Sequence, residues 1–419
     1  MLKSKKLYDK TKNCESCVTK PCQMGCPLNN DITGFIKCVK EEKIKDAYEI
    51  LSKTTVLPAL CGRICPHMSQ CQGSCVKGVS YEPVEIGKLE AYVADIALEN
   101  NWKIKSPTLL KNKVAVIGGG PAGLTCAAFL RRNGVAVTIY EKYDYLGGIM
   151  VHGIPEFRLP KTLVKKVTDN IISLGIDVEY NKELGKNIKL ADLEKEYDAI
   201  FVGIGANISS KMDIPGEELN GVYGGNELLE HNIKLDYTGK TVIVSGGGNV
   251  AMDVCRTAKR NGAEKVYVVY RRSEKEMPAE KIEVKEAKEE GIEFIFQNNI
   301  LKILGEDKVT GIELIKTELV QKEGESRPSP VNIEGSNYVI DCDYVMMAVG
   351  SHPEEEIVNN LDLELDKRGK ILISKTGETS RENIFSGGDV AGSRGTVAGA
   401  SRAGRDAAYK ILEYLKIND

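Results

Sequence analysis

Two glycine-rich turns of the same kind constrain the fold of this 419-residue chain more than any other feature. Each follows an apolar run, residues 114–117 in the first case and 241–244 in the second. A continuous apolar run is typical of a buried parallel strand, and each turn leads into a segment with helical spacing of apolar residues. Strand, turn and helix in this order predict an α/β fold in which one nucleotide-binding unit occurs twice.

The first turn has the spacing Gly118-x-Gly120-x-x-Gly123. In such a turn one glycine allows the tight bend, one lets the backbone approach a pyrophosphate, and one lets the helix pack on the sheet. The next predicted strand, 137–140, ends in Glu141, where a carboxylate can accept hydrogen bonds from ribose hydroxyls. The alternative is a glycine-rich turn without a ligand; the acid at the expected distance favours a bound dinucleotide.

The second turn, Gly246-x-Gly248-x-x-Ala251, is followed by a strand that ends differently. Strand 266–269 leads to Arg271 and Arg272 instead of an acid. Paired guanidinium groups suit a 2′-phosphate better than a free hydroxyl, so the sequence predicts NADPH rather than NADH. A solvated basic turn is the alternative.

An acidic tip on one unit and a basic tip on the other predict a flavin in the first site and a nicotinamide in the second. Glycines at 147 and 148 would let the backbone pass close to the first nucleotide. A predicted strand from 384 delivers Asp389, and helix 397–415 then begins with a positive end that can stabilise reduced, anionic flavin. An ordinary turn or N-cap role for Asp389 is the alternative.

Nine of the twelve cysteines lie between Cys14 and Cys75. Their spacings are C-x2-C-x4-C-x3-C-P, which resembles an iron–sulfur run, and C-x3-C-P-x4-C-x3-C. No export signal is present and the count is odd, so disulfides are disfavoured. Two zinc sites could use the same residues. The predicted flavin favours iron–sulfur clusters, which can split hydride pairs into single electrons.

One cluster ligand stays open between two residues. In the predicted helix 86–99, Glu90 interrupts an apolar stripe formed by Ile86, Val93 and Ala97. A buried carboxylate needs a partner, which iron could supply, leaving Cys61 as a packing residue. Alternatively, Cys61 is the ligand and Glu90 faces solvent or an arginine. The remaining cysteines are predicted to pack in the core: Cys38, Cys126, Cys255 and Cys342.

Composition excludes several classes of protein. The net charge is −3, so no overall positive field attracts nucleic acid. The longest apolar stretch, 114–130, contains four glycines and a proline, so no membrane span is expected. Residues 1–13 are charged throughout and do not read as a signal peptide, which predicts a cytoplasmic protein. Only four scattered histidines are present, so a multi-histidine metal centre is not expected.

The expected domain order follows from these segments. A mainly helical cysteine-rich domain occupies 1–108, and a flavin-binding domain occupies 109–237 and 346–419. The nicotinamide-binding domain, 238–345, is nested between its two parts and carries a small antiparallel excursion at 302–337.

Taken together, these motifs resemble the small subunit of NADPH-dependent glutamate synthase and its relatives over essentially the whole chain. Relatives include the NADPH-oxidising half of dihydropyrimidine dehydrogenase and the larger subunit of electron-bifurcating NADH-dependent ferredoxin:NADP oxidoreductase. Besides the turns and cysteine runs, the resemblance rests on the segments 152–160, 277–279 and 387–389. It implies a glutathione-reductase-like pair of nested Rossmann domains preceded by an iron–sulfur domain.

The resemblance also implies FAD, NADPH and two [4Fe-4S] clusters. One cluster would be held by Cys14, Cys17, Cys22 and Cys75, and the other by Cys26, Cys65, Cys71 and Glu90, with Cys61 as the alternative to Glu90. The residues expected to bind FAD are Gly118, Gly120, Pro121, Ala122, Gly123, Glu141, Lys142, Gly148, Arg158, Gly388, Asp389 and Val397. Those expected to bind NADPH are Gly246, Gly248, Asn249, Val250, Arg271 and Arg272.

The predicted function is an oxidoreductase that passes electrons between NADP(H), FAD and the two clusters to or from a partner subunit. No catalytic side-chain acid or base is expected, because stacking two flat rings makes hydride transfer a local event. One alternative is a flavin-dependent NADPH dehydrogenase acting alone on a small acceptor. Another is a zinc-stabilised, nucleotide-binding interaction module. A disulfide reductase would need a Cys-x-x-Cys near the flavin, and none occurs after residue 75.

Overall fold

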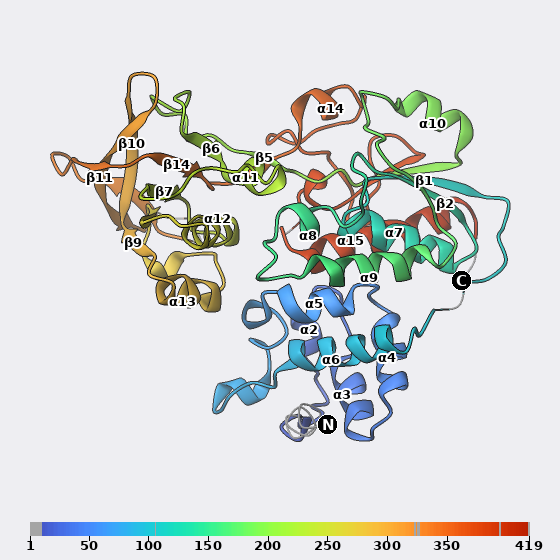
Figure 1. The fold of residues 1–419 in the computed structure, drawn as a ribbon. Coiled ribbons are helices and arrows are strands. Elements are labelled where there is room, and N and C mark those ends of the chain that lie inside the picture. Colours follow the sequence, from blue (N-terminus) through green and yellow to red (C-terminus); the bar gives the residue numbers. More distant parts are fainter. Residues whose placement is uncertain (1–10, 105, 322–323, 325–326, 394, 418–419) are drawn as a thin grey trace. The chain divides into compact units, whose positions relative to one another are not determined.

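The computed structural model describes residues 11–104, 106–321, 324, 327–393 and 395–417. These residues form two compact units, coloured by sequence in Figure 1. The first unit takes in the described parts of Met1–Val151, Glu156–Ala206 and Pro353–Asp419, and the second takes in His152–Pro155 and Asn207–His352. The second unit is therefore inserted in the chain of the first.

The amino-terminal part of the first unit is helical. Proline at the first turn starts both α2 and α5, and the Asp31 side chain caps α3 by accepting from the Gly34 amide. A core of Phe35, Leu51, Leu89 and their neighbours holds the helices together. The elements are α2 (Pro21–Gly25), α3 (Ile32–Lys40), α4 (Ile44–Ser52), α5 (Pro58–Ile64), α6 (Ile86–Glu99) and the 3₁₀ turns η1 (His67–Ser69) and η2 (Val76–Val79).

A five-stranded parallel sheet forms the rest of the first unit, in the order β16-β4-β1-β2-β3. Its strands are β1 (Lys113–Ile117), β2 (Ala136–Tyr140), β3 (Asp177–Glu179), β4 (Ala199–Val202) and β16 (Ile384–Ser386). The helices are α7 (Pro121–Arg132), α8 (Ile149–His152), α9 (Lys161–Ile172), α10 (Leu190–Glu196), α14 (Glu355–Asn359) and α15 (Val397–Tyr414), with the 3₁₀ turn η4 (Asp389–Ala391).

Helices α7 and α15 come from opposite ends of this part of the chain and lie side by side (Figure 1). A Cβ on Gly404 would stand 2.0 Å from the Ala122 carbonyl oxygen, so the two backbones nearly touch. The Thr125 and Ser401 hydroxyls hydrogen-bond across the contact at 2.8 Å. This packing brings the start of α15 to the strand–turn–helix segment of β1 and α7.

The second unit contains a similar parallel sheet in the order β6-β14-β7-β8-β9. Its strands are β6 (Val222–Gly224), β7 (Thr241–Ser245), β8 (Lys265–Tyr270), β9 (Glu293–Phe296) and β14 (Tyr344–Met347). Its helices are α11 (Gly225–Glu230), α12 (Asn249–Arg260) and α13 (Lys281–Glu289), with the 3₁₀ turn η3 (Glu274–Glu276). The antiparallel excursion comprises β10 (Asn298–Gly305), β11 (Val309–Val320), β12 (Ser329–Asn332) and β13 (Tyr338–Asp341).

Strand pairing gives the second unit more of the chain than residues 238–345. Strand β6 pairs with β14, and β5 (Ile208–Ser209) pairs with β15 (Ser351–His352), so the chain on both sides of the predicted range joins this unit. Neither added segment carries the strand–turn–helix pattern of the two nucleotide turns, so the strands that they pair with were not visible in the residue pattern.

No helix among the described residues is both long and apolar enough to cross a membrane. The prediction that the amino-terminal segment is not a signal peptide concerns residues 1–13, of which 1–10 lie outside the described part of the chain.

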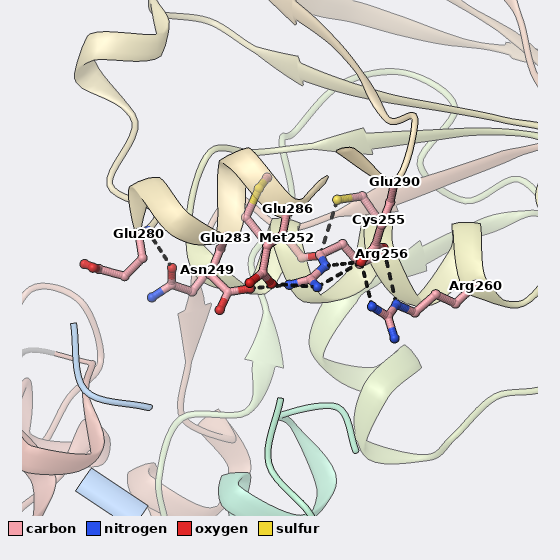
Figure 2. Close-up of polar contacts among 9 residues, drawn as sticks. All are labelled: Asn249, Met252, Cys255, Arg256, Arg260, Glu280, Glu283, Glu286 and Glu290. Carbon is pink, nitrogen blue, oxygen red and sulfur yellow. Dashed lines mark hydrogen bonds and ion pairs between the residues drawn. The ribbon is translucent and has the colours of Figure 1, made fainter. Parts of the chain in front are cut away.

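Helices α12 and α13 are joined by a buried ion-pair network around Arg256 (Figure 2). The Arg256 side chain is 4% exposed and pairs with Glu283 at 2.5 Å, Glu286 at 2.8 Å and Glu290 at 2.9 Å. Arg260, one turn further along α12, also pairs with Glu290 but is 45% exposed. The network fixes α13 against the helix that follows the second glycine-rich turn.

Replacing Arg256 with methionine is expected to lower the free energy of unfolding of the second unit by about 3–5 kcal/mol, because Glu283 stays buried without its cation. The matched change Arg260→Met removes an exposed partner of Glu290 and should cost less than about 1 kcal/mol. Urea unfolding followed by circular dichroism measures both. Equal losses in the two variants would show that the buried network adds nothing beyond surface pairing.

Candidate cofactor-binding sites

The first set of cysteines converges on one pocket in the helical part of the first unit. Cys14, Cys17, Cys22 and Cys75 all line it, together with apolar side chains such as Ile32 and Ile36. Helix α2 carries Cys22, and Cys75 precedes η2. Burial first, and then the neighbouring Cys75 and Cys14 thiols, raise the pKa of Cys22 to about 11. Thiols this close can all ionise only beside a cation, so the donor set fits an iron–sulfur cluster.

The second set also comes together, and it includes the carboxylate. Burial, followed by the nearby Glu90 and Cys26, raises the pKa of Cys71. The pKa of Cys26 rises to about 11, chiefly through burial and less through Glu90 and Cys61. Burial alone raises the pKa of Glu90 to about 8. Cys65, at the end of α5, adjoins Cys61, Glu90 and Cys71. Three thiols and a carboxylate thus share one buried neighbourhood.

The structure shows whether Glu90 is exposed or buried, a point that the sequence left open. Glu90 is 5% exposed, and the side-chain amide of Asn30 donates a hydrogen bond to the Glu90 Oε1 at 3.3 Å. Glu90 therefore does not face solvent, and the side chain recorded against it among the described residues is Asn30; Glu90 and Cys61 both stay predictions for the last ligand. Cys61 itself is buried in α5 within hydrogen-bonding reach of the Cys65 sulfur.

Among the described residues, no three Cys, His, Asp or Glu side chains are grouped closely enough to hold a single metal ion. In a [4Fe-4S] cluster the four protein ligands bind four different irons. The twelve cysteines are all free thiols, and Cys126, Cys255 and Cys342 are buried, in agreement with a packing role, whereas Cys38 is partly exposed.

The first glycine-rich turn lies between β1 and α7, as predicted. Gly118 has φ +100°, and a Cβ there would stand 2.5 Å from the Gly203 carbonyl oxygen, so only glycine fits. Gly120 is the N-cap of α7 and Pro121 begins it, with Ala122 and Gly123 in the first helical turn. The amides at this helix end point outward without helical partners, as an anion site requires.

Glu141 follows β2 and lies against the same turn. Its Oε2 accepts from the Gly119 amide at 2.6 Å and its Oε1 accepts from the Tyr143 amide at 3.0 Å. Burial raises the pKa of Glu141, while these amide hydrogen bonds oppose the rise. The carboxylate is thereby held beside the turn, where ribose hydroxyls of a bound nucleotide would lie.

Of the other residues expected at this site, Gly148 and Gly388 lie beside the turn. The Gly119 carbonyl accepts from Gly147, and a Cβ on Gly148 would stand 2.9 Å from the Gly120 Cα. Gly388 adjoins the Ala122 Cβ, and Val397 begins α15. Asp389 begins η4 and accepts from the Ser393 hydroxyl at 2.7 Å. Lys142 lies over the Tyr143 ring, and Arg158 is half-buried after α8.

The second glycine-rich turn repeats this geometry. Gly246 has φ +139°, and a Cβ there would stand 2.2 Å from the Ala348 carbonyl oxygen. Gly248 is the N-cap of α12, and no described atom lies within 4 Å of where its Cβ would be. Asn249 and Val250 open the helix, and the Asn249 Oδ1 accepts from the Glu280 amide at 3.0 Å (Figure 2). The turn is therefore held by Ala348 and Glu280 at Gly246 and Asn249, and the space beside Gly248 is open.

Arg271 and Arg272 directly follow β8 and differ in their surroundings. Arg271 is exposed, whereas the Arg272 Nε donates to the Pro328 carbonyl at 2.9 Å. A third guanidinium, Arg327, reaches the same place from the excursion and donates to the Tyr270 hydroxyl at 3.2 Å and to the Glu276 carbonyl. Three arginines thus gather at the tip of β8, where a 2′-phosphate is predicted.

Comparison with known proteins shows the family to which the chain belongs. Residues 112–406 match the family model described as pyridine nucleotide-disulphide oxidoreductase, and residues 1–102 match dihydropyrimidine dehydrogenase domain II, 4Fe-4S cluster. The small chain of NADPH glutamate synthase from Escherichia coli (strain K12) is 35% identical over 426 residues, which cover 96% of this chain and 90% of that protein. The chain belongs to the glutamate synthase small-chain family.

Another relative is named as a subunit of its enzyme. The beta subunit of NADP(+)-dependent formate dehydrogenase from Moorella thermoacetica is 33% identical over 430 residues, which cover 95% of this chain and 60% of that protein. Among solved structures, Mycobacterium tuberculosis FprA in complex with NADPH superposes with a TM-score of 0.65 at 19% identity, covering 73% of this chain and 85% of that one. This likeness supports the fold alone.

Membership of the glutamate synthase small-chain family confirms the predicted fold class and the predicted oxidoreductase activity with FAD, NADPH and 4Fe-4S chemistry. The alternative of zinc in place of iron is not supported, because residues 1–102 match a 4Fe-4S domain. The cofactor-binding residues and domain bounds remain predictions.

Three residues of this family member were missed by the sequence analysis. Asn30 contacts Glu90, Arg327 reaches the tip of β8, and the Arg405 Nη1 in α15 donates to the carbonyls of Leu28 at 2.7 Å and Thr54 at 3.2 Å. Each acts over a long sequence separation, and none lies in a motif. Through these hydrogen bonds, Arg405 joins the cysteine-rich helical part to α15, the helix that begins beside the first nucleotide turn.

Proposed function

We propose that this chain passes electrons between NADP(H) and a separate partner protein, by way of FAD in the first unit and two [4Fe-4S] clusters in its helical part. One observation carries the proposal: both predicted ligand sets lie in the same compact unit as the predicted flavin site, and Arg405 of α15 holds the segments around the second set. When bound, a flavin accepts hydride pairs, and iron–sulfur clusters carry single electrons.

The roles of the chain's own residues in this proposal are binding and orientation. The glycine-rich turns hold the pyrophosphates at the starts of α7 and α12, and Glu141 holds the ribose of the flavin nucleotide. Arg271 and Arg272 bind the 2′-phosphate of NADPH. No side chain is assigned a proton transfer.

We also assign the cluster ligands as predicted. Cys14, Cys17, Cys22 and Cys75 hold one cluster, and Cys26, Cys65, Cys71 and Glu90 hold the other. The assignment is supported by the convergence of the first set on one pocket, by the closeness of the second set to Glu90, and by the match of residues 1–102 to a 4Fe-4S domain.

A partner protein is proposed for two reasons. The relatives from E. coli and M. thermoacetica are named as a small chain and a beta subunit of their enzymes. In addition, electrons that leave through clusters leave one at a time, so the acceptor must be able to take them singly, as a redox centre in a partner protein can.

The test is anaerobic purification of the full chain from its native source, followed by cofactor analysis and identification of co-purifying proteins. We expect one FAD, about eight irons and about eight acid-labile sulfides per chain, bleaching of the flavin by NADPH, and a stoichiometric partner. Absence of both flavin and sulfide would contradict the proposal. Full turnover of a small acceptor by the isolated chain, unaffected by loss of its iron, would favour a dehydrogenase that acts alone.

A further inference from the structure

Three side chains, ending with Glu90, are joined by two successive hydrogen bonds. The Thr54 hydroxyl donates to the Asn30 Oδ1 at 2.5 Å, and the Asn30 Nδ2 donates to the Glu90 Oε1 at 3.3 Å. Asn30 is 2% exposed and Glu90 is 5% exposed, so water does not compete for these contacts. The Asn30 Oδ1 faces the Thr54 hydroxyl, and the amide nitrogen points at the carboxylate.

Asn30 also reaches a second member of the same ligand set. Its backbone N–H, together with that of Leu28, donates to the Cys26 sulfur. One residue thus contacts both Cys26, through the main chain, and Glu90, through the side chain. Because the two contacts use different parts of Asn30, a side-chain substitution removes one and leaves the other.

The two segments that bear Asn30 and Thr54 are held by one guanidinium. Arg405, whose side chain is 12% exposed, donates from Nη1 to the Leu28 and Thr54 carbonyls. Since Thr54 orients Asn30 and Arg405 fixes the backbone on both sides, the amide has little freedom to turn. A fixed amide is a suitable support for a carboxylate that must present its other oxygen to a metal.

We infer that Asn30 is a positioning residue that fixes the orientation of the Glu90 carboxylate for iron. This rests on the proposed role of Glu90 as a cluster ligand. Carboxylates that bind metals are usually hydrogen-bonded by a neighbouring group, and loss of such a neighbour typically weakens metal binding by about 10- to 100-fold. A cysteine at position 90 would bind iron through a single sulfur and would not need the amide.

The experiment compares Asn30→Ala, Glu90→Cys and the double variant Asn30→Ala/Glu90→Cys, each as the full chain with FAD and anaerobically reconstituted clusters. The readouts are the rate at which a chelator removes iron from each cluster and the electron paramagnetic resonance spectrum of each reduced cluster. In Asn30→Ala we expect one cluster to lose iron about 10-fold faster, with an altered spectrum, while the other cluster serves as the internal control.

In the Glu90→Cys background, adding Asn30→Ala should change neither readout. A third variant, Thr54→Val, keeps the Asn30 donor but frees its orientation, and should give a smaller effect in the same direction as Asn30→Ala.

The inference is overturned if Asn30→Ala leaves both clusters unchanged, or if it speeds iron loss equally in the Glu90→Cys background, which would show a general effect on packing. Failure of the ligand assignment itself gives a different result, because Glu90→Ala would then leave both clusters intact. Should Asn30→Ala fail to retain FAD, the comparison of Thr54→Val with Thr54→Val/Glu90→Cys decides the same question.

Discussion

The double variant Arg271→Ala/Arg272→Ala should bleach its flavin with NADPH about 100- to 10,000-fold less efficiently than the native chain, while the efficiency with NADH barely changes. Each charge-assisted hydrogen bond to the 2′-phosphate contributes about 1.5–3 kcal/mol, and about 1.4 kcal/mol corresponds to tenfold. NADH lacks this phosphate, so it loses nothing when the arginines are removed. Anaerobic stopped-flow absorbance of the flavin, with each nucleotide below saturation, gives both efficiencies.

The two arginines should not contribute alike. Arg271 is exposed and its side chain is the cleaner probe, whereas Arg272 also holds the Pro328 carbonyl, so Arg272→Ala loosens the excursion as well. Arg368→Ala, which removes an exposed guanidinium from the first unit, is the matched control and should leave both efficiencies unchanged. If the double variant keeps the native preference for NADPH, the arginines do not bind the 2′-phosphate.

Local sequence signals were sufficient to predict β1, which precedes the first nucleotide turn, and α6, which carries Glu90. The predicted strand 114–117 lies within β1 (Lys113–Ile117), and the predicted helix 86–99 matches α6 (Ile86–Glu99). Both segments have strong apolar patterns, and both glycine turns have φ values and close contacts that exclude other residues. The physical constraint on each segment is local, so it appears in the residues themselves.

Contacts between distant residues could not be predicted in the same way. Arg405 contacts Leu28 across a separation of 377 residues, and Asn30 contacts Glu90 across 60. Nothing in the spacing around Arg405, in an ordinary amphipathic helix, distinguishes it from the neighbouring Arg402. The burial of Glu90 was visible as an interruption of an apolar stripe, but its partner depended on how α6 packs against the loop before α3.

Glu90→Ala is expected to lose one of the two clusters, so that purified protein retains about four irons per chain instead of about eight. The remaining cluster should show an unchanged spectrum, because its proposed ligands Cys14, Cys17, Cys22 and Cys75 line a pocket that does not include Glu90. Alanine removes the carboxylate that raises the pKa of Cys26, Cys65 and Cys71, and three thiolates then leave one iron without a protein ligand. Iron and sulfide analysis with electron paramagnetic resonance measures the loss.

Cys61→Ala is the matched variant that separates the two candidate ligands. Both residues are buried and both lie near Cys65, so a general effect of a cavity on the cluster would be similar in the two proteins. If Glu90 binds iron, Cys61→Ala keeps both clusters and Glu90→Ala loses one. The reverse outcome would assign the ligand to Cys61, and the Glu90 carboxylate would then be a buried group hydrogen-bonded to Asn30 without a metal. Loss of a cluster in both variants, with FAD retained, would mean that packing around α5 and α6, rather than one coordinating atom, limits cluster binding.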